Sequence, residues 1–250
     1  MIFPIGDDNS DRTTTPIVTY ALIAINILVF VFLQGLGGND QFTYAISTVP
    51  QEIVTGQDID RPVPISVGEQ RGTIDLQPTP GSVYLTLLTS MFMHGSLMHL
   101  FGNMLYLWIF GDNIEHTLGR MRYLVFYLVT GLVASLAHVF TTVAFGGNPY
   151  IPSLGASGAI SGVLGGYLLL FPRRQVRVFM LRMLTTVPAI VAIGIWFLFQ
   201  LIEGYLTRGP EAGGGVAYAA HIGGFIAGLV LIKFFAIGRG GNNSRPAQAY

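Results

Sequence analysis

Apolar residues gather in six long stretches, separated by shorter segments that carry most of the charge. The stretches cover residues 16–37, 93–111, 122–145, 157–171, 187–206 and 216–237. A helix needs about 20 predominantly apolar residues to cross the hydrocarbon core of a bilayer. The pattern therefore predicts an all-α membrane protein with six transmembrane helices.

The charged residues between these stretches predict which side each connection faces. The segment 38–82 contains six acidic residues against two arginines. Ten of the 13 lysines and arginines lie before the first stretch, beside the second–third and fourth–fifth connections, or in the last stretch and beyond it. Because basic residues accumulate on the cytoplasmic side, we expect both termini to be cytoplasmic. The predicted division is a cytoplasmic tail 1–15, a membrane domain 16–237 with its loop 38–82 outside, and a cytoplasmic tail 238–250.

The fourth stretch is too short for a simple membrane crossing. Ser157 to Leu170 gives about 21 Å of helix at 1.5 Å per residue, whereas the hydrocarbon core is about 30 Å thick. Pro152 and Pro172 limit its extension on both sides. Non-helical backbone is tolerated at membrane depth only when it is buried in protein or lines a wet cavity. We therefore expect the loop "GGNPYIPSLG" to dip into the bilayer, with Ser157 at the floor of a water-filled cavity.

Composition supports the membrane assignment and excludes several classes of function. Of the 250 residues, 51% are hydrophobic and only 10% are charged, whereas soluble domains carry about 25% charged residues. The chain has no cysteine and a net charge of zero, so disulfides and thiolate metal sites are impossible and a nucleic-acid partner is not expected. There is no H-E-x-x-H zinc motif and no pair of aspartates within the apolar stretches. We expect neither a metal nor a cofactor.

Polar residues inside membrane spans are candidates for function, and five of them stand out. His94, His99 and Asn103 lie in "HGSLMHLFGN", Ser157 lies in "GASG", and His221 lies in "YAAHIGGFIAG". His99 and Asn103 are four residues apart and therefore share one face of a helix. These residue types together supply a nucleophile, a base and hydrogen-bond donors.

Two stripes of small residues predict how these side chains meet. Gly158, Gly162 and Gly166 recur every four residues in the fourth stretch, and Ala220, Gly224 and Gly228 do so in the sixth. Such stripes let two helices approach closely, so His221 comes within reach of Ser157. A base beside a serine hydroxyl makes it a nucleophile. With no acidic residue nearby, the sequence predicts a Ser-His dyad, with oxyanion donors available from His99, Asn103 and the Ser157 backbone.

Three motifs in this order resemble those of the rhomboid family of intramembrane serine proteases: "HGSLMHLFGNMLYLWIFGDNIEHTLG", "GASGAISG" and "AHIGGFIAG". The resemblance covers nearly the whole chain after residue 84 and implies a rhomboid-like bundle with Ser157 as nucleophile and His221 as general base. It also implies roles for neighbouring residues. These are oxyanion or substrate binding by His99, Asn103 and Gly155, support of the site by His94, a structural role for Glu115, and helix contacts at Gly158, Gly162 and Gly224.

The resemblance implies a further feature, and this chain also departs from some of its relatives. The fifth stretch, around Trp196, matches a helix proposed as a lateral gate for substrates. Some relatives carry a tyrosine one turn after the nucleophile, packed on the catalytic histidine. This chain has Ser161 at that position, so His221 must be held otherwise.

The expected function is hydrolysis of peptide bonds in transmembrane segments of membrane-protein substrates, within the lipid bilayer. Two alternatives remain open: a catalytically silent rhomboid-like protein that binds membrane clients, and a small transporter, since interrupted glycine-rich helices also build transport sites. The six-helix core suggests a multi-pass protein of the plasma membrane, which is the inner membrane of a bacterial cell. The sequence does not assign an oligomeric state.

Overall fold

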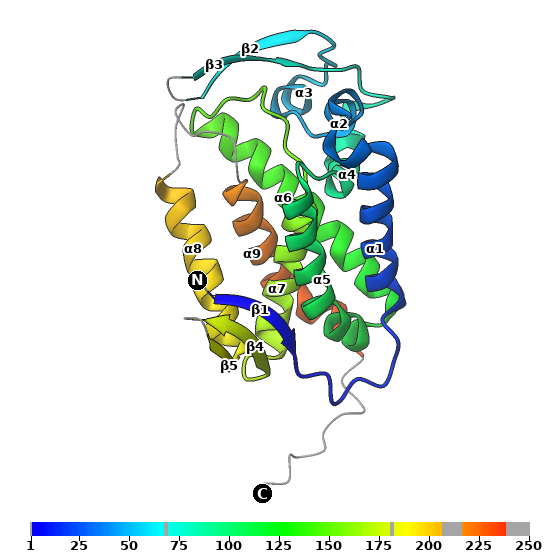
Figure 1. Ribbon diagram of the computed structural model, residues 1–250, viewed down its shortest axis with the longest axis vertical. Coiled ribbons are helices and arrows are strands. Elements are labelled where there is room, and N and C mark those ends of the chain that lie inside the picture. The colour runs from blue at the N-terminus through cyan, green and yellow to red at the C-terminus, as the bar shows by residue number, and fades with distance from the viewer. Residues whose placement is uncertain (1, 68–69, 181–182, 207–216, 239–250) are drawn as a thin grey trace, which may run out of the picture.

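The chain folds into a mostly helical bundle, seen here in a computed structural model (Figure 1). It describes residues 2–67, 70–180, 183–206 and 217–238. The predicted tail 238–250 lies outside the described residues except for Gly238, and residue 216 at the start of the sixth predicted stretch lies outside them too.

A helix lies at each of the six predicted stretches. In chain order the helices are α1 (Ile17–Leu28), α5 (Leu97–Leu118), α6 (Arg120–Ala144), α7 (Ser157–Leu170), α8 (Ala189–Leu206) and α9 (Tyr218–Ala236). A π-helical turn, Val29–Leu33, and a 3-10 turn, Gly35–Gly37, extend α1. The fourth of the six helices, α7, is short at 14 residues, as the flanking prolines predicted.

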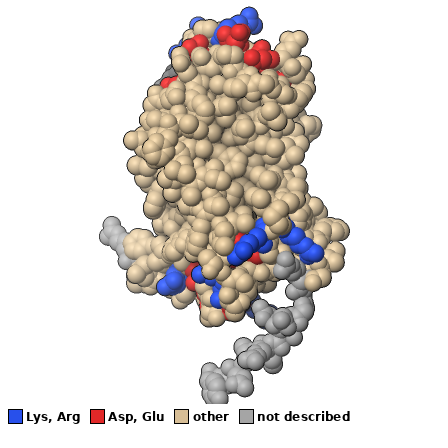
Figure 2. Space-filling view, turned by 90° about the vertical axis from the view of Figure 1, so that its right-hand side faces the viewer, with Lys and Arg blue, Asp and Glu red and all other residues tan. Residues whose placement is uncertain are grey.

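The long helices differ in how clearly they qualify as membrane spans. Three of them, α6, α8 and α9, are long and apolar enough to cross a bilayer. Residues Ile17–Leu33, Val83–Phe92 and Ser157–Leu170 form shorter apolar helices. On the face that Figure 2 shows, a broad band without charged side chains separates two charged ends. This arrangement is typical of a protein surrounded by lipid.

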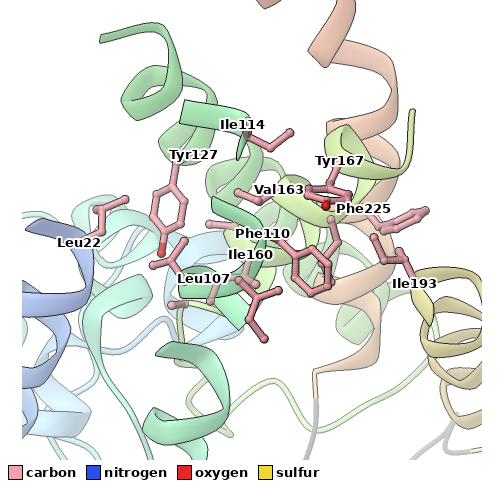
Figure 3. Packing of buried hydrophobic residues seen from close by; sticks show 14 of the residues in the cluster. Leu22, Leu107, Phe110, Ile114, Tyr127, Ile160, Val163, Tyr167, Ile193 and Phe225 are labelled. Atoms are coloured by element: carbon pink, nitrogen blue, oxygen red, sulfur yellow. The ribbon is translucent and has the colours of Figure 1, made fainter. Parts of the chain in front are cut away.

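The short helix α7 lies at the centre of the bundle. It packs against α9, α6 and α5, and its side chains Ile160, Val163 and Tyr167 belong to the main hydrophobic core (Figure 3). The same core includes Phe110 of α5 and Phe225 of α9. Ser157 at the start of α7 is therefore held by helices from three other parts of the chain.

The segment between α1 and α5 is structured and covers one end of the bundle (Figure 1). It contains α2 (Asp40–Ile46), α3 (Pro50–Thr55), the hairpin of β2 (Pro62–Val67) and β3 (Gln70–Asp75), and three short helical turns, η3 (Val83–Leu85), α4 (Thr86–Thr89) and η4 (Ser90–Phe92). Val49, Val63 and Leu76 form a small core of their own there.

The prediction of an all-α fold is wrong in one respect, because strands occur at both ends of the bundle. At the end opposite the hairpin, β1 (Ile2–Asp7), β4 (Gln175–Met180) and β5 (Met183–Pro188) form an antiparallel sheet in the order β1-β4-β5. Val176 and Val178 of β4 are buried while Arg177 between them is exposed. This alternation is that of a half-buried strand, whereas the basic residues alone suggested a simple connection.

Candidate active site

Ser157 is the first residue of α7, and the loop before it is fixed by backbone contacts. Ser153 pairs with Thr48 in an isolated β-bridge, and the Gly155 N–H donates to the Ser90 carbonyl at 2.9 Å. Gly155 has φ +124°, a backbone conformation that residues with a side chain rarely adopt. The hydroxyl of Ser157 is thus presented at a helix N-terminus, where the positive end of the helix dipole favours developing negative charge.

His221 of α9 lies beside Ser157. Its Nε2 is 2.8 Å from the Ser157 Oγ, within hydrogen-bond distance. The small residues make this approach possible. A Cβ on Gly224 would lie 2.1 Å from the Gly158 carbonyl oxygen, and one on Gly228 would lie 2.0 Å from the Gly162 oxygen. The backbones of α7 and α9 are therefore in direct contact.

The glycine stripe of α7 faces two helices. Side chains at Gly158 and Gly162 would clash mainly with Ala134 and Thr130 of α6. A Cβ on Gly165 would lie 2.2 Å from the Phe225 oxygen of α9, whereas one on Gly166 would meet side chains of Ile232 and Phe126. Thus α7 fits closely between α6 and α9, and Gly165 is the glycine of α7 whose Cβ would meet the α9 backbone.

His99 and Asn103 of α5 line the same cavity as Ser157. Ser96 caps α5 by accepting a hydrogen bond from the His99 N–H at 3.1 Å. The His99 ring packs against Gly155, where a Cβ would lie 2.9 Å from the ring Nε2. Asn103 is 7% exposed, and its Nδ2 has no hydrogen-bond partner among the residues that the structure describes. A buried amide without a partner is available to a ligand oxygen.

These side chains surround one cavity of about 560 Å³. Its lining includes polar groups of α5, α7 and α9 together with Trp196 of α8: His99, Asn103, Ser157, Ser161, Trp196 and His221. The volume lies in the range of ligand-binding pockets, about 300–1,000 Å³. Ser157 thus borders a cavity, as expected from the short fourth stretch.

His94 lies behind His99. It is 1% exposed, and the two rings are 5.1 Å apart in an edge-on arrangement. The side chain of Gln34 holds the His94 backbone from both sides: Oε1 accepts from the His94 N–H at 2.9 Å, and Nε2 donates to its carbonyl at 3.0 Å. Sequence reasoning missed Gln34, although a glutamine at the end of an apolar stretch is itself a polar residue that needs an explanation.

Gln200 and Trp196 of α8 are also residues that the sequence reasoning did not include in the site. The Gln200 Oε1 is 2.7 Å from the His221 Nδ1. The rings of Trp196 and His221 are 6.1 Å apart. Ser161, at the position where some relatives have tyrosine, donates to the Ser157 carbonyl at 2.6 Å. His221 is therefore contacted by α8, on the side opposite Ser157.

Glu115 lies apart from the cavity, at the other end of α5. Its carboxylate accepts hydrogen bonds from the Val18 N–H at 2.9 Å, the Thr19 N–H at 2.7 Å and the Thr19 hydroxyl at 2.8 Å. The residue before α1, Pro16, provides no side-chain cap. Glu115 therefore satisfies the first N–H groups of α1, which a helix leaves unpaired.

A polar network at this same end joins the N-terminal strand to the bundle. Asp7 of β1 is 6% exposed and accepts hydrogen bonds from the Tyr167 hydroxyl at 2.6 Å and the Asn113 Nδ2 at 2.7 Å. Burial raises the pKa of the Asp7 carboxyl to about 7. Arg12 pairs with Asp112 nearby. The strand is thus tied to α5 and to the far end of α7.

The described residues contain no group of three or more His, Cys, Asp or Glu side chains placed to hold a metal ion. The chemistry available at the cavity is that of a hydroxyl beside an imidazole, with further hydrogen-bond donors in the same lining. Such an arrangement is suited to nucleophilic attack on a carbonyl carbon and stabilisation of the resulting oxyanion.

Comparison with known proteins identifies the class to which this bundle and site belong. Residues 81–237 match the Rhomboid domain family model. This match spans more than half of the chain, which therefore belongs to the rhomboid family and is an integral membrane protein.

Individual relatives agree with this assignment. The chain is 29% identical over 226 residues to the rhomboid protease GluP of Bacillus subtilis, covering 90% of this chain and 36% of that protein. It is 32% identical over 151 residues to the mitochondrial rhomboid protein 1 of Saccharomyces cerevisiae, covering 58% and 40% of the two chains. It is 33% identical over 150 residues to the mitochondrial presenilin-associated rhomboid-like protein of Bos taurus, covering 59% and 37%. The alignments thus span less than half the length of each relative.

Proposed function

We propose that this protein is an intramembrane serine endopeptidase that cleaves transmembrane segments of membrane-protein substrates. The observation that carries the proposal is the 2.8 Å contact between the Ser157 Oγ and the His221 Nε2. This contact borders a cavity whose lining also includes Asn103. Membership of the rhomboid family and similarity to a protein named as a protease support the same function.

In the acylation step, His221 Nε2 accepts the hydroxyl proton while Ser157 Oγ attacks the substrate carbonyl carbon. The Asn103 Nδ2, the His99 ring and the Ser157 N–H are the proposed donors to the oxyanion. The imidazolium then gives its proton to the departing amine as the peptide bond breaks. A water molecule, deprotonated by His221, attacks the acyl carbon. The ester bond to Ser157 Oγ then breaks, His221 returns the proton to Oγ, and the second product leaves as an acid.

The proposed arrangement in the membrane follows the charge distribution. Six helices cross the bilayer with both termini in the cytoplasm and the hairpin β2–β3 on the outer side. Water reaches the cavity from that outer side, and the substrate enters from the lipid beside α8. Residence in the plasma membrane is part of the proposal. The names of two relatives instead give a mitochondrial location. Fractionation of the native cells, followed by detection of the protein in each membrane fraction, distinguishes the two locations.

The test is cleavage of a generic transmembrane substrate by purified protein in liposomes. We expect cleavage by the wild type and by Ser10→Ala, which makes the same change at an exposed serine. We expect none by Ser157→Ala or His221→Ala. Activity retained in pure Ser157→Ala would contradict the proposal. Substrate binding without cleavage by the wild type would favour the silent, client-binding alternative.

A further inference from the structure

Both ring nitrogens of His221 have a partner. Nε2 is 2.8 Å from the Ser157 Oγ, and Nδ1 is 2.7 Å from the Gln200 Oε1. A dyad requires only the first contact. The second comes from Gln200 of α8, which lies outside the lining of the cavity; among the residues described, α8 contributes Trp196 to that lining.

The Gln200 contact decides which nitrogen carries the proton. A neutral imidazole has one N–H donor and one acceptor nitrogen. Because an amide oxygen only accepts, its neighbour Nδ1 must hold the proton, and Nε2 is left with a free lone pair directed at the Ser157 hydroxyl. This is the tautomer that a general base needs. The opposite tautomer would donate to Ser157 and could not accept its proton.

The packing of α8 on α9 holds Gln200 at this position. Trp196, Gln200 and Gly204 recur every four residues in α8 and therefore share one face of it. The Trp196 ring lies 6.1 Å from that of His221. A Cβ on Gly204 would lie 3.1 Å from the Tyr218 Cβ of α9. Along this face of α8, Trp196 and Gln200 lie beside His221, and Gly204 lies beside Tyr218. The face therefore contacts α9 over the turn that carries His221.

Ser161 of α7 does not hold the His221 ring in the way that Gln200 does. Ser161, one turn after Ser157, uses its hydroxyl in a 2.6 Å bond to the Ser157 carbonyl. It follows that the orientation of the imidazole depends on α8, a helix distant in sequence from the nucleophile.

We propose that Gln200 is a positioning residue that fixes the tautomer and orientation of His221 and so extends the dyad to a Ser157–His221–Gln200 triad. This inference rests on the proposed function. During acylation the proton of Ser157 moves to Nε2, the Nδ1 proton stays on the ring, and Gln200 remains neutral. Its hydrogen bond strengthens as the imidazolium forms, because charge-assisted hydrogen bonds are stronger than neutral ones. The arrangement holds only while α8 is packed against α9.

The first test compares Gln200→Leu, which has no acceptor, with Gln200→Glu, which keeps one. Gln57→Leu makes the same polar-to-apolar change at an exposed position. We expect Gln200→Leu to lower kcat for substrate cleavage by about 10- to 100-fold, as for loss of a hydrogen bond to a charged group, with little change in KM. Gln200→Glu should stay within about tenfold of the wild type, because it keeps the acceptor. Gln57→Leu should match the wild type.

A second test reads the tautomer directly and does not require activity. Protein labelled with ¹⁵N-histidine is measured by NMR, and the His221 signals are identified by their loss in His221→Ala. We expect an Nδ1-protonated ring in the wild type and a changed tautomer in Gln200→Leu. An unchanged tautomer with an unchanged kcat in Gln200→Leu would overturn the role of Gln200. Absence of cleavage by the wild type, with the expected tautomer shift in Gln200→Leu, would instead contradict only the proposed function.

Discussion

Replacement of Gly224 by alanine is expected to inactivate Ser157 without removing any group from the site. The added Cβ would lie 2.1 Å from the Gly158 oxygen and 3.0 Å from its carbonyl carbon. Both are backbone atoms of α7, so no side-chain rotation relieves the clash. To restore an ordinary contact, α7 and α9 must separate by about 1 Å.

This separation acts directly on the reacting groups. Gly158 follows Ser157 in the chain, and Gly224 lies one turn after His221. The 2.8 Å between the Ser157 Oγ and the His221 Nε2 would therefore lengthen to nearly 4 Å, beyond the range of about 3.2 Å for a hydrogen bond. A displacement of this size can cost about 10²-fold in rate, and overpacking costs typically about 1–3 kcal/mol of stability.

The assay measures kcat/KM for a transmembrane substrate, together with thermal unfolding of the same preparations. The matched control is Gly194→Ala in α8, because a Cβ at Gly194 would meet nothing within 4 Å. We expect Gly224→Ala to lose about 10²-fold in kcat/KM and Gly194→Ala to behave as the wild type. A folded Gly224→Ala with wild-type kcat/KM would refute the inference that this helix contact sets the Ser157–His221 distance.

Three further predictions concern other parts of the molecule. Asn103→Ala should lower kcat by about 10²–10³-fold, as loss of one oxyanion donor does; an unchanged kcat would exclude Asn103 from that role. Glu115→Ala leaves two N–H groups of α1 without an acceptor, so the free energy of unfolding should fall by about 1–3 kcal/mol per group. The unfolding temperature should fall accordingly, and less in Glu115→Gln. Equal unfolding temperatures would contradict the capping role. Because the pKa of Asp7 is about 7 in the fold against 3.8 unperturbed, the folded state binds the proton more tightly. Stability should therefore fall as pH rises from about 4 to 7, and Asp7→Asn should flatten this dependence in thermal unfolding measured across that range.

The sequence predicted the positions of the long helices because each has an apolar pattern of its own. It missed the sheet at the end of the bundle because β1 and β4 are about 170 positions apart, and no local signal pairs "IFPIGD" with "QVRVFM". The alternation of Val176, Arg177 and Val178 is a local strand signal. It was outweighed by the basic residues around it.

The glycine stripes predicted the meeting of α7 and α9, but not every contact. Four residues advance an α-helix by about 400°, so a strict four-residue stripe drifts by about 40° per step. Side chains added at Gly158 and Gly162 would point at α6, whereas a Cβ on Gly165 would meet the α9 backbone at the Phe225 oxygen. The stripe therefore predicted that α7 and α9 meet, but not which helix each glycine of α7 faces.

Gln34 and Gln200 were missed for a different reason. Each lies inside an apolar stretch, where a polar residue signals that it needs a partner but does not say which residue that partner is. Their roles depend on residues 60 and 21 positions away, His94 and His221. Such contacts require the three-dimensional arrangement of α1, α8 and α9.

The most direct test of the account is labelling of the purified protein with a fluorophosphonate, which reacts with activated serines, followed by mass spectrometry of the labelled peptide. The wild type is compared with Ser157→Ala, His221→Ala and the exposed-serine control Ser10→Ala. We predict labelling of the wild type and of Ser10→Ala at Ser157, and none of the other two variants. A folded wild type that is not labelled, or label found in Ser157→Ala, would contradict the claim that His221 activates Ser157.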